Sequence, residues 1–323
     1  MFMILPVIYF VIGLILLIKG GDWFVDGATG VAHRFHVPEL LIGATVVSIG
    51  TTLPEVMVSA TSAISGHGEI AYGNAIGSII CNVSLIAAIT IAIRPSKVHP
   101  NSLKLPVFFF FLAAIFYAGT AYITGHFSRI TGIILLIMFG SYIGISVYQI
   151  RKMPAAMTSA TTEEQEDATL IKEILRLIVG AILIAIGANL LVDNGTIIAR
   201  ELGVPESVIA LTFVALGTSL PELVTAITSL TKGHGALSLG NVIGANLFNL
   251  VLVSGVSAVL SPFDIPSGKV IAGMNSSLVV DIPLMLFVMA FLTFPALKKG
   301  RLSRYQGIVL LLLYAVFCIY QFV

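Results

Sequence analysis

The sequence predicts an all-α integral membrane protein whose ten transmembrane helices form two inverted five-helix repeats. The first observation is composition: 57% of the 323 residues are hydrophobic, only 10% are charged, and the mean hydropathy is +1.03. Soluble domains carry about 25% charged residues, so this composition is typical of a chain embedded in lipid. The second observation is a series of long apolar runs, and the third is a motif that occurs twice.

A membrane-spanning helix needs about 20 mostly apolar residues, and ten runs of the chain meet that requirement. They cover residues 3–19, 37–64, 70–93, 105–123, 128–149, 171–192, 204–230, 236–260, 277–297 and 304–322. We expect residues 1–150 to hold the first five-helix repeat and residues 171–323 to hold the second. The polar segment 151–170 is expected to be the linker between them.

The distribution of positive charge predicts the orientation, because cytoplasmic loops of membrane proteins are enriched in Lys and Arg. With ten spans and an external N-terminus, the cytoplasmic side receives most of the 17 basic residues: Lys19, Arg34, Arg94, Lys97, Lys104, Arg151, Lys152, Lys172, Arg176, Lys232, Lys298, Lys299, Arg301 and Arg304. The outer side keeps Arg129, Arg200 and Lys269. We therefore expect a multi-pass protein of the cell (plasma) membrane with the 151–170 linker in the cytoplasm.

The two halves of the chain align with each other at a constant shift of 167 residues. Placed without a gap, Gly20–Ala92 and Gly187–Val259 are identical at 27 of 73 positions. The repeated motifs lie in residues 37–93 and 204–260. Each half is expected to hold five spans, an odd number, so the halves enter the membrane with opposite topology. Inverted repeats with interrupted helices and a midplane site are the architecture of many secondary transporters.

Each repeat places a glutamate inside an apolar span. Residues 49–55 read IGTTLPE, and residues 216–222 read LGTSLPE. Holding a charge in hydrocarbon costs several kcal/mol, so an intramembrane ionisable residue is a functional-site hypothesis. Two such residues at equivalent positions strengthen that hypothesis.

The residues around these glutamates are polar on one helix face. Thr51 and Thr52 precede Glu55 by four and three residues, a spacing that brings their side chains together. Pro54 lacks an N–H and clashes with the carbonyl four residues earlier, so we expect it to distort the turn through Thr51 and to expose carbonyl oxygens. The second motif repeats this pattern with Thr218, Ser219, Pro221 and Glu222.

The span after each glutamate adds further polar groups and small residues. Ser78 and Asn82 are four residues apart and share a helix face, and Asn249 is the second-repeat equivalent of Asn82. The glycine pairs at 73 and 77 and at 240 and 244 allow helix backbones to approach closely.

These donors predict a hard, all-oxygen cation site. Calcium takes 6–8 oxygen ligands and tolerates irregular geometry, and two carboxylates would balance its charge. The same oxygens suit Na⁺. No resident cofactor is expected. A net charge of +1 argues against nucleic acid as a partner, and the motifs lack the paired nucleophile and base of an intramembrane enzyme. A channel is disfavoured because filters are built from rings of equivalent groups.

Both glutamate motifs, with the GN-x-IG-x-x-x-x-N segments that follow them, resemble the repeats of the sodium/calcium exchanger family, within the cation/calcium antiporter superfamily. The resemblance implies exchange of three Na⁺ for one Ca²⁺ by alternating access, with the first and sixth spans sliding over the other eight. It assigns Ca²⁺ to Glu55, Glu222, Thr51 and Thr218. It assigns Na⁺ to Ser48, Thr52, Glu55, Ser78, Asn82, Ala215, Ser219, Glu222 and Asn249. A single chain is expected to function as a monomer in the bilayer.

Two positions depart from the family pattern. Ala245 stands where many relatives have serine, which leaves the stoichiometry open, and Asn249 stands where potassium-dependent exchangers have Asp, which favours independence from K⁺. The proton-coupled branch places an acidic residue shortly after its Gly-Asn pair, whereas Ile76 and Ile243 lie there in this chain. Exchange of H⁺ for Ca²⁺, or transport of another divalent cation, stays the alternative.

Overall fold

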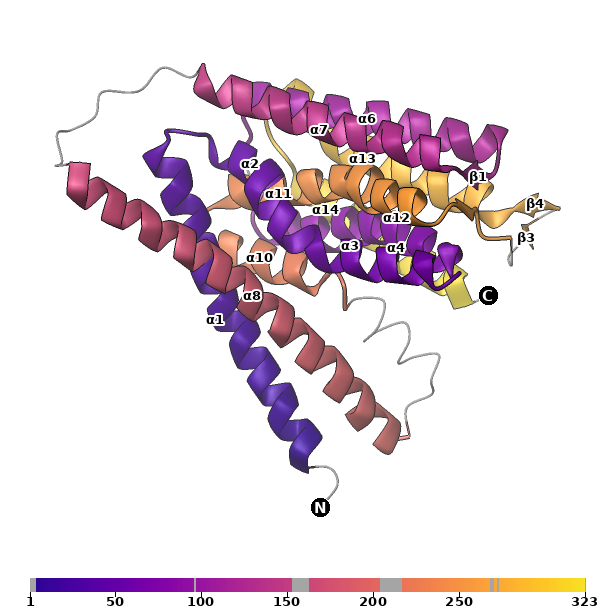
Figure 1. The fold of residues 1–323 in the computed structure, drawn as a ribbon, viewed down its shortest axis with the longest axis horizontal. Helices are drawn as coiled ribbons and strands as arrows, with labels where there is room; N and C mark the ends of the chain where they lie inside the picture. The colour runs from indigo at the N-terminus through magenta and orange to yellow at the C-terminus, as the bar shows by residue number, and fades with distance from the viewer. Residues whose placement is uncertain are drawn as a thin grey trace.

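The computed structural model describes residues 4–95, 97–152, 163–203, 217–267, 270–271 and 273–322, and the side chains of these ranges other than 163–169 and 322. Most of these residues are helical (Figure 1). The α-helices and π-helical segments (η) are α1 (Ile4–Arg34), α2 (Glu39–Ile42), η1 (Gly43–Val47), α3 (Ser48–Ile64), α4 (Gly68–Cys81), η2 (Asn82–Ala87), α5 (Ala88–Ile93), α6 (Pro100–Ile123), α7 (Arg129–Arg151), α8 (Glu163–Glu201), α10 (Leu220–Thr231), α11 (Gly235–Phe248), η4 (Asn249–Val253), α12 (Ser254–Leu260), η5 (Ser277–Asp281), α13 (Ile282–Lys299) and α14 (Arg304–Phe322). The short strands pair antiparallel, β1 (His126–Phe127) with β2 (Phe263–Asp264) and β3 (Val270–Ile271) with β4 (Met274–Asn275).

Within the described ranges, nine helical segments are long and apolar enough to cross a membrane. They correspond to nine of the ten predicted spans. Most of the described part of the remaining span, 204–230, is helix α10, and its residues 204–216 lie outside the described ranges. The count of ten therefore stays a prediction.

Two helices extend beyond their predicted spans. Helix α1 continues to Arg34 although its first apolar run ends near residue 19, and α8 begins at Glu163, inside the segment predicted to be a linker. Hydropathy marks the stretch that can lie in lipid, whereas a helix continues wherever its backbone hydrogen bonds are maintained. Residues 153–162 of the predicted linker lie outside the described ranges.

The spans that carry the repeated motifs contain π-helical turns. Segment η1 ends immediately before Ser48, η2 begins at Asn82 and η4 begins at Asn249. π-Helical turns are rare and frequently occur at functional sites. The α geometry of α3 continues through Pro54, so the departure lies about one turn earlier than predicted. In the second motif Pro221 lies in the first turn of α10, where its missing N–H leaves no helical hydrogen bond unmade.

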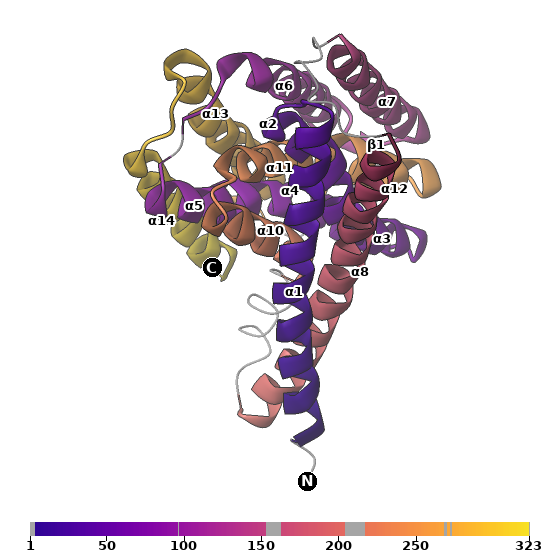
Figure 2. The ribbon, with the colours of Figure 1, turned by 90° about the vertical axis from the view of Figure 1, so that its left-hand side faces the viewer.

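Helices α1 and α8 pack side by side along the outside of the bundle and extend beyond it (Figures 1 and 2). Glycines permit this contact. A methyl group on Gly13 would lie 2.8 Å from the carbonyl oxygen of Gly187, and one on Gly20 would lie 3.0 Å from that of Gly180. Adding 167 to 13 and 20 gives 180 and 187. The two contacts are therefore equivalent under exchange of the repeats.

Helix α11 lies in the interior of the bundle, and twelve of its fourteen residues are buried. Gly240 packs against the backbone of Leu40, and a methyl group on Gly244 would lie 2.6 Å from the Cα atom of Ala44. This is the close backbone approach that the glycine spacing predicts. Contact between α11 and the segment formed by α2 and η1 brings the two repeats together.

The turn between α10 and α11 is tied to helices of the first repeat. The Lys232 ammonium lies 2.7 Å from Oδ1 of Asp26 and 3.3 Å from Oδ1 of Asp22, both on α1. In the same turn Nδ1 of His234 lies 2.8 Å from Oε1 of Glu39, the first residue of α2. Gly233, with φ +89°, supplies the left-handed conformation that the turn requires. One turn therefore holds both α1 and α2.

Candidate functional site

Glu55 on α3 and Glu222 on α10 are fully buried in the bundle. Their carboxylates lie close enough for the two charges to interact. Within the described residues, none of the four carboxylate oxygens has a hydrogen-bond partner. Both glutamates of the repeated motif are therefore buried in the interior of the bundle, where the charge of one acts on the other.

Such a pair is unstable without compensation. A charge that is buried and unpaired costs several kcal/mol, and a second like charge beside it adds repulsion. A bound cation would compensate both costs, and carboxylate oxygens are ligands that Ca²⁺ prefers. The residues at the site thus fit a hard cation.

Two asparagines link the repeats beside the glutamates. The Thr51 hydroxyl donates to Oδ1 of Asn241 at 3.1 Å, and the Thr218 hydroxyl donates to Oδ1 of Asn74 at 3.2 Å. Each bond joins one repeat to the other, and a shift of 167 converts one bond into its counterpart. A hydroxyl has a single hydrogen, so a threonine that donates to asparagine keeps its oxygen lone pairs for another ligand.

The first motif is attached to its surroundings through further bonds. The Ser48 hydroxyl lies 2.7 Å from the carbonyl oxygen of Gly43 and 3.0 Å from that of Asn241. The Asn74 amide donates to Ser59 Oγ at 2.8 Å and to the carbonyl oxygen of Glu55 at 3.3 Å. These bonds fix the backbone that carries Glu55.

Other predicted site residues are buried polar groups. The hydroxyls of Thr52 and Ser219 and the side chain of Asn249 are buried without a hydrogen-bond partner among the described residues. Asn82 donates to Oδ1 of Asn246 at 3.2 Å. The Ser78 hydroxyl lies 3.5 Å from Oδ1 of Asn74.

Two positions that the sequence analysis singled out have alanine, which provides no side-chain ligand. Ala245, the repeat equivalent of Ser78, is fully buried and offers no side-chain oxygen. Ala215, predicted to contribute to Na⁺ binding, lies outside the described residues.

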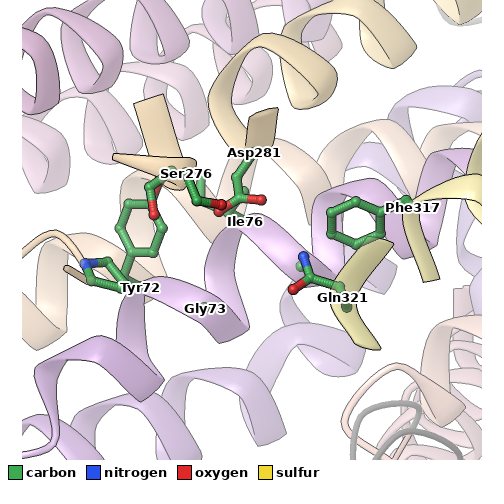
Figure 3. Close-up of a pocket in the computed structure, with 10 residues that line it drawn as sticks. Tyr72, Gly73, Ile76, Ser276, Asp281, Phe317 and Gln321 are labelled. Atoms are coloured by element: carbon green, nitrogen blue, oxygen red, sulfur yellow. The ribbon is translucent and has the colours of Figure 1, made fainter. Parts of the chain in front are cut away.

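Cavities lie along the same flank of α4. One of about 380 Å³ is lined by Asn74, Ser78 and Thr218, together with residues of α14. A neighbouring cavity of about 350 Å³ is lined by Tyr72, Ser276 and Asp281 (Figure 3). Residues around the candidate site therefore border space that an ion could enter.

Sequence reasoning did not assign Asn74, Asn241 or Asn246 to the site. The first two were detectable, because both Gly-Asn pairs are identities of the internal repeat. Asn246 aligns with Ile79, so the repeat gives no signal for it. Its role follows only from the hydrogen bonds of the folded chain.

The described residues contain no group of three or more His, Cys, Asp or Glu side chains arranged to hold a metal ion. The candidate donors are two carboxylates supplemented by hydroxyl and amide oxygens. This donor set suits Na⁺ and Ca²⁺ better than softer metals.

Comparison with known proteins gives a consistent result. The family model described as "Sodium/calcium exchanger protein" matches residues 5–148 and 172–323. The uncharacterized membrane protein MJ0091 of Methanocaldococcus jannaschii is 38% identical over 318 residues, covering 97% of each chain. The sodium/calcium exchanger MaX1 of Methanosarcina acetivorans is 28% identical and covers 96% of this chain and 97% of its own. A solved structure of the sodium-calcium exchanger NCX_Mj, soaked with Na⁺ and Sr²⁺, has a TM-score of 0.82 and 34% identity, covering 97% of this chain and 98% of its own.

Proposed function

This chain belongs to the sodium/calcium exchanger family, and from that premise we propose that it is a secondary antiporter that exchanges Na⁺ for Ca²⁺ across a membrane. The exchange takes place by alternating access at one site near the membrane midplane, with Glu55 and Glu222 as the central cation ligands. The family consists of cation exchangers rather than enzymes, so no bond of a substrate is made or broken.

The observation that carries this proposal is the pair of fully buried, interacting carboxylates whose oxygens have no hydrogen-bond partner among the described residues. Their combined charge of −2 matches one Ca²⁺ and is compensated equally well by Na⁺ ions. The site is poorly stable when charged and empty, so it releases one kind of ion as it accepts the other. This obligatory occupancy couples the two fluxes.

We assign Ca²⁺ to Glu55, Glu222, Thr51 and Thr218. The donor bonds from the two threonines to Asn241 and Asn74 support this assignment, since they leave the hydroxyl oxygens available as ligands. Na⁺ ions share the glutamates and take the remaining oxygens, those of Ser48, Thr52, Ser78, Asn82, Ala215, Ser219 and Asn249. The lack of a hydroxyl at Ala245 weakens one of the Na⁺ positions.

Inverted repeats give alternating access a physical basis. If the two halves can exchange conformations, the same chain opens its site first to one face of the membrane and then to the other. The interchangeable contacts of Gly13 with Gly187 and of Gly20 with Gly180 support this view, as do the paired threonine–asparagine bonds. We also propose ten spans, from the ten apolar runs, and an external N-terminus with a cytoplasmic linker, from the distribution of Lys and Arg.

The proposal is tested by ion flux into proteoliposomes that contain the purified protein. Vesicles loaded with Na⁺ are diluted into Na⁺-free buffer that contains radioactive Ca²⁺, and choline replaces Na⁺ in the control. We expect Ca²⁺ uptake that requires internal Na⁺ and stops when Na⁺ is equal on both sides.

A second set of vesicles carries a pH gradient without Na⁺. Uptake that follows the pH gradient and ignores Na⁺ would identify an H⁺/Ca²⁺ exchanger instead. Uptake that depends on neither gradient would contradict exchange as the function.

A further inference from the structure

Three side chains in the interior of the bundle form a directed chain of hydrogen bonds. Nδ2 of Asn246 donates to Sδ of Met289 at 3.3 Å, and Nδ2 of Asn82 donates to Oδ1 of Asn246 at 3.2 Å. All three side chains are fully buried. Asn82 opens the π-helical segment η2, Asn246 lies on α11 and Met289 lies on α13.

The chemistry of the chain fixes its direction. A thioether sulfur carries no hydrogen and can only accept a hydrogen bond. The amide NH₂ of Asn246 must therefore face Met289, which turns its carbonyl oxygen toward Asn82. Asn82 in turn must present its NH₂ to that oxygen, so its own Oδ1 points away from Asn246. This Oδ1 is buried and has no partner among the described residues.

The second repeat lacks this arrangement. Asn249 is the equivalent of Asn82, and neither its nitrogen nor its oxygen has a partner among the described residues. The equivalent of Asn246 in the first repeat is Ile79, which cannot form a hydrogen bond. Among the described residues, one of the two site amides is thus held in a single orientation, and its counterpart has no group that holds it.

We propose that Asn246 is a positioning residue for Na⁺ binding: it holds the amide of Asn82 with the oxygen directed to the ion, and Met289 holds Asn246. The inference rests on the proposed role of Asn82 as a Na⁺ ligand. An amide that turned over would direct its NH₂ to the cation and repel it. Residues that orient a ligand in this way commonly change metal affinity about 10- to 100-fold when they are removed.

The test measures Ca²⁺ binding to the purified full-length protein by isothermal titration. It also determines the Na⁺ concentration at which the amount of bound Ca²⁺ falls to half. Asn246→Leu removes the acceptor for Asn82 at similar volume. We expect about tenfold more Na⁺ to be needed for half-competition, with the Kd for Ca²⁺ changed less than about twofold because Asn82 is outside the Ca²⁺ set.

Two further variants separate positioning from packing. Asn246→Asp keeps an acceptor oxygen and is expected to retain the parent's ratio of Na⁺ competition to Ca²⁺ affinity. Met289→Leu lets the Asn246 amide adopt both orientations. If these are equally populated, half of the molecules are competent and the Na⁺ requirement rises about twofold.

The variant Asn82→Ala distinguishes an error in this inference from an error in the proposed function. If Asn82→Ala weakens Na⁺ competition and adding Asn246→Leu weakens it no further, Asn246 acts through Asn82. If Asn82→Ala weakens Na⁺ competition but Asn246→Leu does not, the positioning role is overturned and the proposed function stands. The same conclusion follows if the effects of the two substitutions add in the double variant. If Asn82→Ala leaves competition unchanged, the assignment of Asn82 to Na⁺ is itself wrong.

Discussion

Glu55 and Glu222 are acidic side chains whose burial is energetically unfavourable in the charged state. Both are fully buried, both lie near a like charge, and the described residues give their oxygens no hydrogen bond. Side chains whose purpose was packing would be apolar, because replacing buried charges with hydrophobic groups is often neutral or stabilising. The proposed binding of a cation by these glutamates accounts for their presence in the interior.

We expect Glu55→Gln and Glu222→Gln each to abolish Na⁺-dependent Ca²⁺ uptake. Each change removes one charge from a buried site, a loss of about 3–5 kcal/mol, or more than a hundredfold in affinity. Without Ca²⁺ the variants should unfold at a temperature no lower than the parent, since repulsion between carboxylates is removed. Glu69→Gln, an exposed glutamate at the start of α4, is the matched control. Uptake at the parent rate in either variant would show that its carboxylate is structural.

The hydroxyl of Thr51 gives a finer prediction. Thr51→Val removes the donor to Asn241 and one proposed Ca²⁺ oxygen, whereas Thr51→Ser keeps both. A lost polar contact of this kind is worth on the order of 1 kcal/mol, so Val should raise the Kd for Ca²⁺ about fivefold and Ser should leave it near the parent value. Equal affinities for the Val and Ser variants in isothermal titration would remove Thr51 from the ligand set.

The glutamates and threonines could be predicted from the sequence because the cost of charge in lipid and the internal repeat both single them out. The bonds of Asn74 and Asn241 could not be predicted. Their partners lie on the other repeat, and pairing across 190 residues depends on how the spans pack. The role of Asn246 is harder to predict from the sequence, because its equivalent in the first repeat is Ile79 and the internal repeat therefore does not single it out.

At the scale of elements, hydropathy predicted which segments span the membrane but misjudged where helices end. Helix α1 continues beyond its first apolar run and includes the acidic residues Asp22 and Asp26, which interrupt the hydrophobic pattern. Their carboxylates lie beside the Lys232 ammonium, which compensates their charge. The π-helical segments also escaped prediction. Their position depends on the packing of α11 against η1, which a linear pattern does not contain.

The packing of α1 on α8 predicts a different sensitivity for two classes of glycine. A methyl group on Gly187 would lie 2.8 Å from the Gly13 carbonyl oxygen, so Gly187→Ala must push the helices apart. Overpacking of this kind costs about 1–3 kcal/mol. Gly144→Ala on α7 meets no described atom within 4 Å and should be neutral or stabilising by up to about 1 kcal/mol.

Thermal unfolding in detergent measures both variants, and Trp23 on α1, the single tryptophan of the chain, reports on the contact by fluorescence. Equal melting temperatures for Gly187→Ala and Gly144→Ala would mean that the α1–α8 contact yields without cost. If α1 and α8 slide during transport, Gly187→Ala should also slow Ca²⁺ uptake while Gly144→Ala does not.

At the scale of the whole molecule, the repeat is visible in contacts, but some contacts of the described residues have no counterpart in the other half. The glycine contacts and the threonine–asparagine bonds have counterparts in the other half. The contacts of Lys232 with Asp22 and Asp26 do not, because the residues equivalent to Lys232 and Asp22 are Ser65 and Asn189. If the chain alternates between two conformations related by the repeat, as we propose, a contact present in one half alone makes those conformations unequal in energy.

Lys232→Ser, which installs the residue of the other repeat, should therefore shift the balance away from the conformation in which Lys232 contacts Asp22 and Asp26. Partly exposed ion pairs contribute up to about 1 kcal/mol, which corresponds to roughly a fivefold change in population. The ratio of half-saturating Ca²⁺ concentrations on the two faces should change by that factor, measured in vesicles in which the protein has one orientation. The face to which a larger fraction of molecules becomes open should gain apparent affinity.

Asp193→Asn supplies the matched control, because Asp193 is the repeat equivalent of Asp26 and the residue equivalent to Lys232 is Ser65, which carries no charge. This variant should leave the ratio near that of the parent. A ratio that stays the same in Lys232→Ser would show that the turn holds α1 with equal strength in both conformations. If the ratio changes by the same factor in both variants, the effect comes from the altered surface charge and not from the contact of Lys232 with α1.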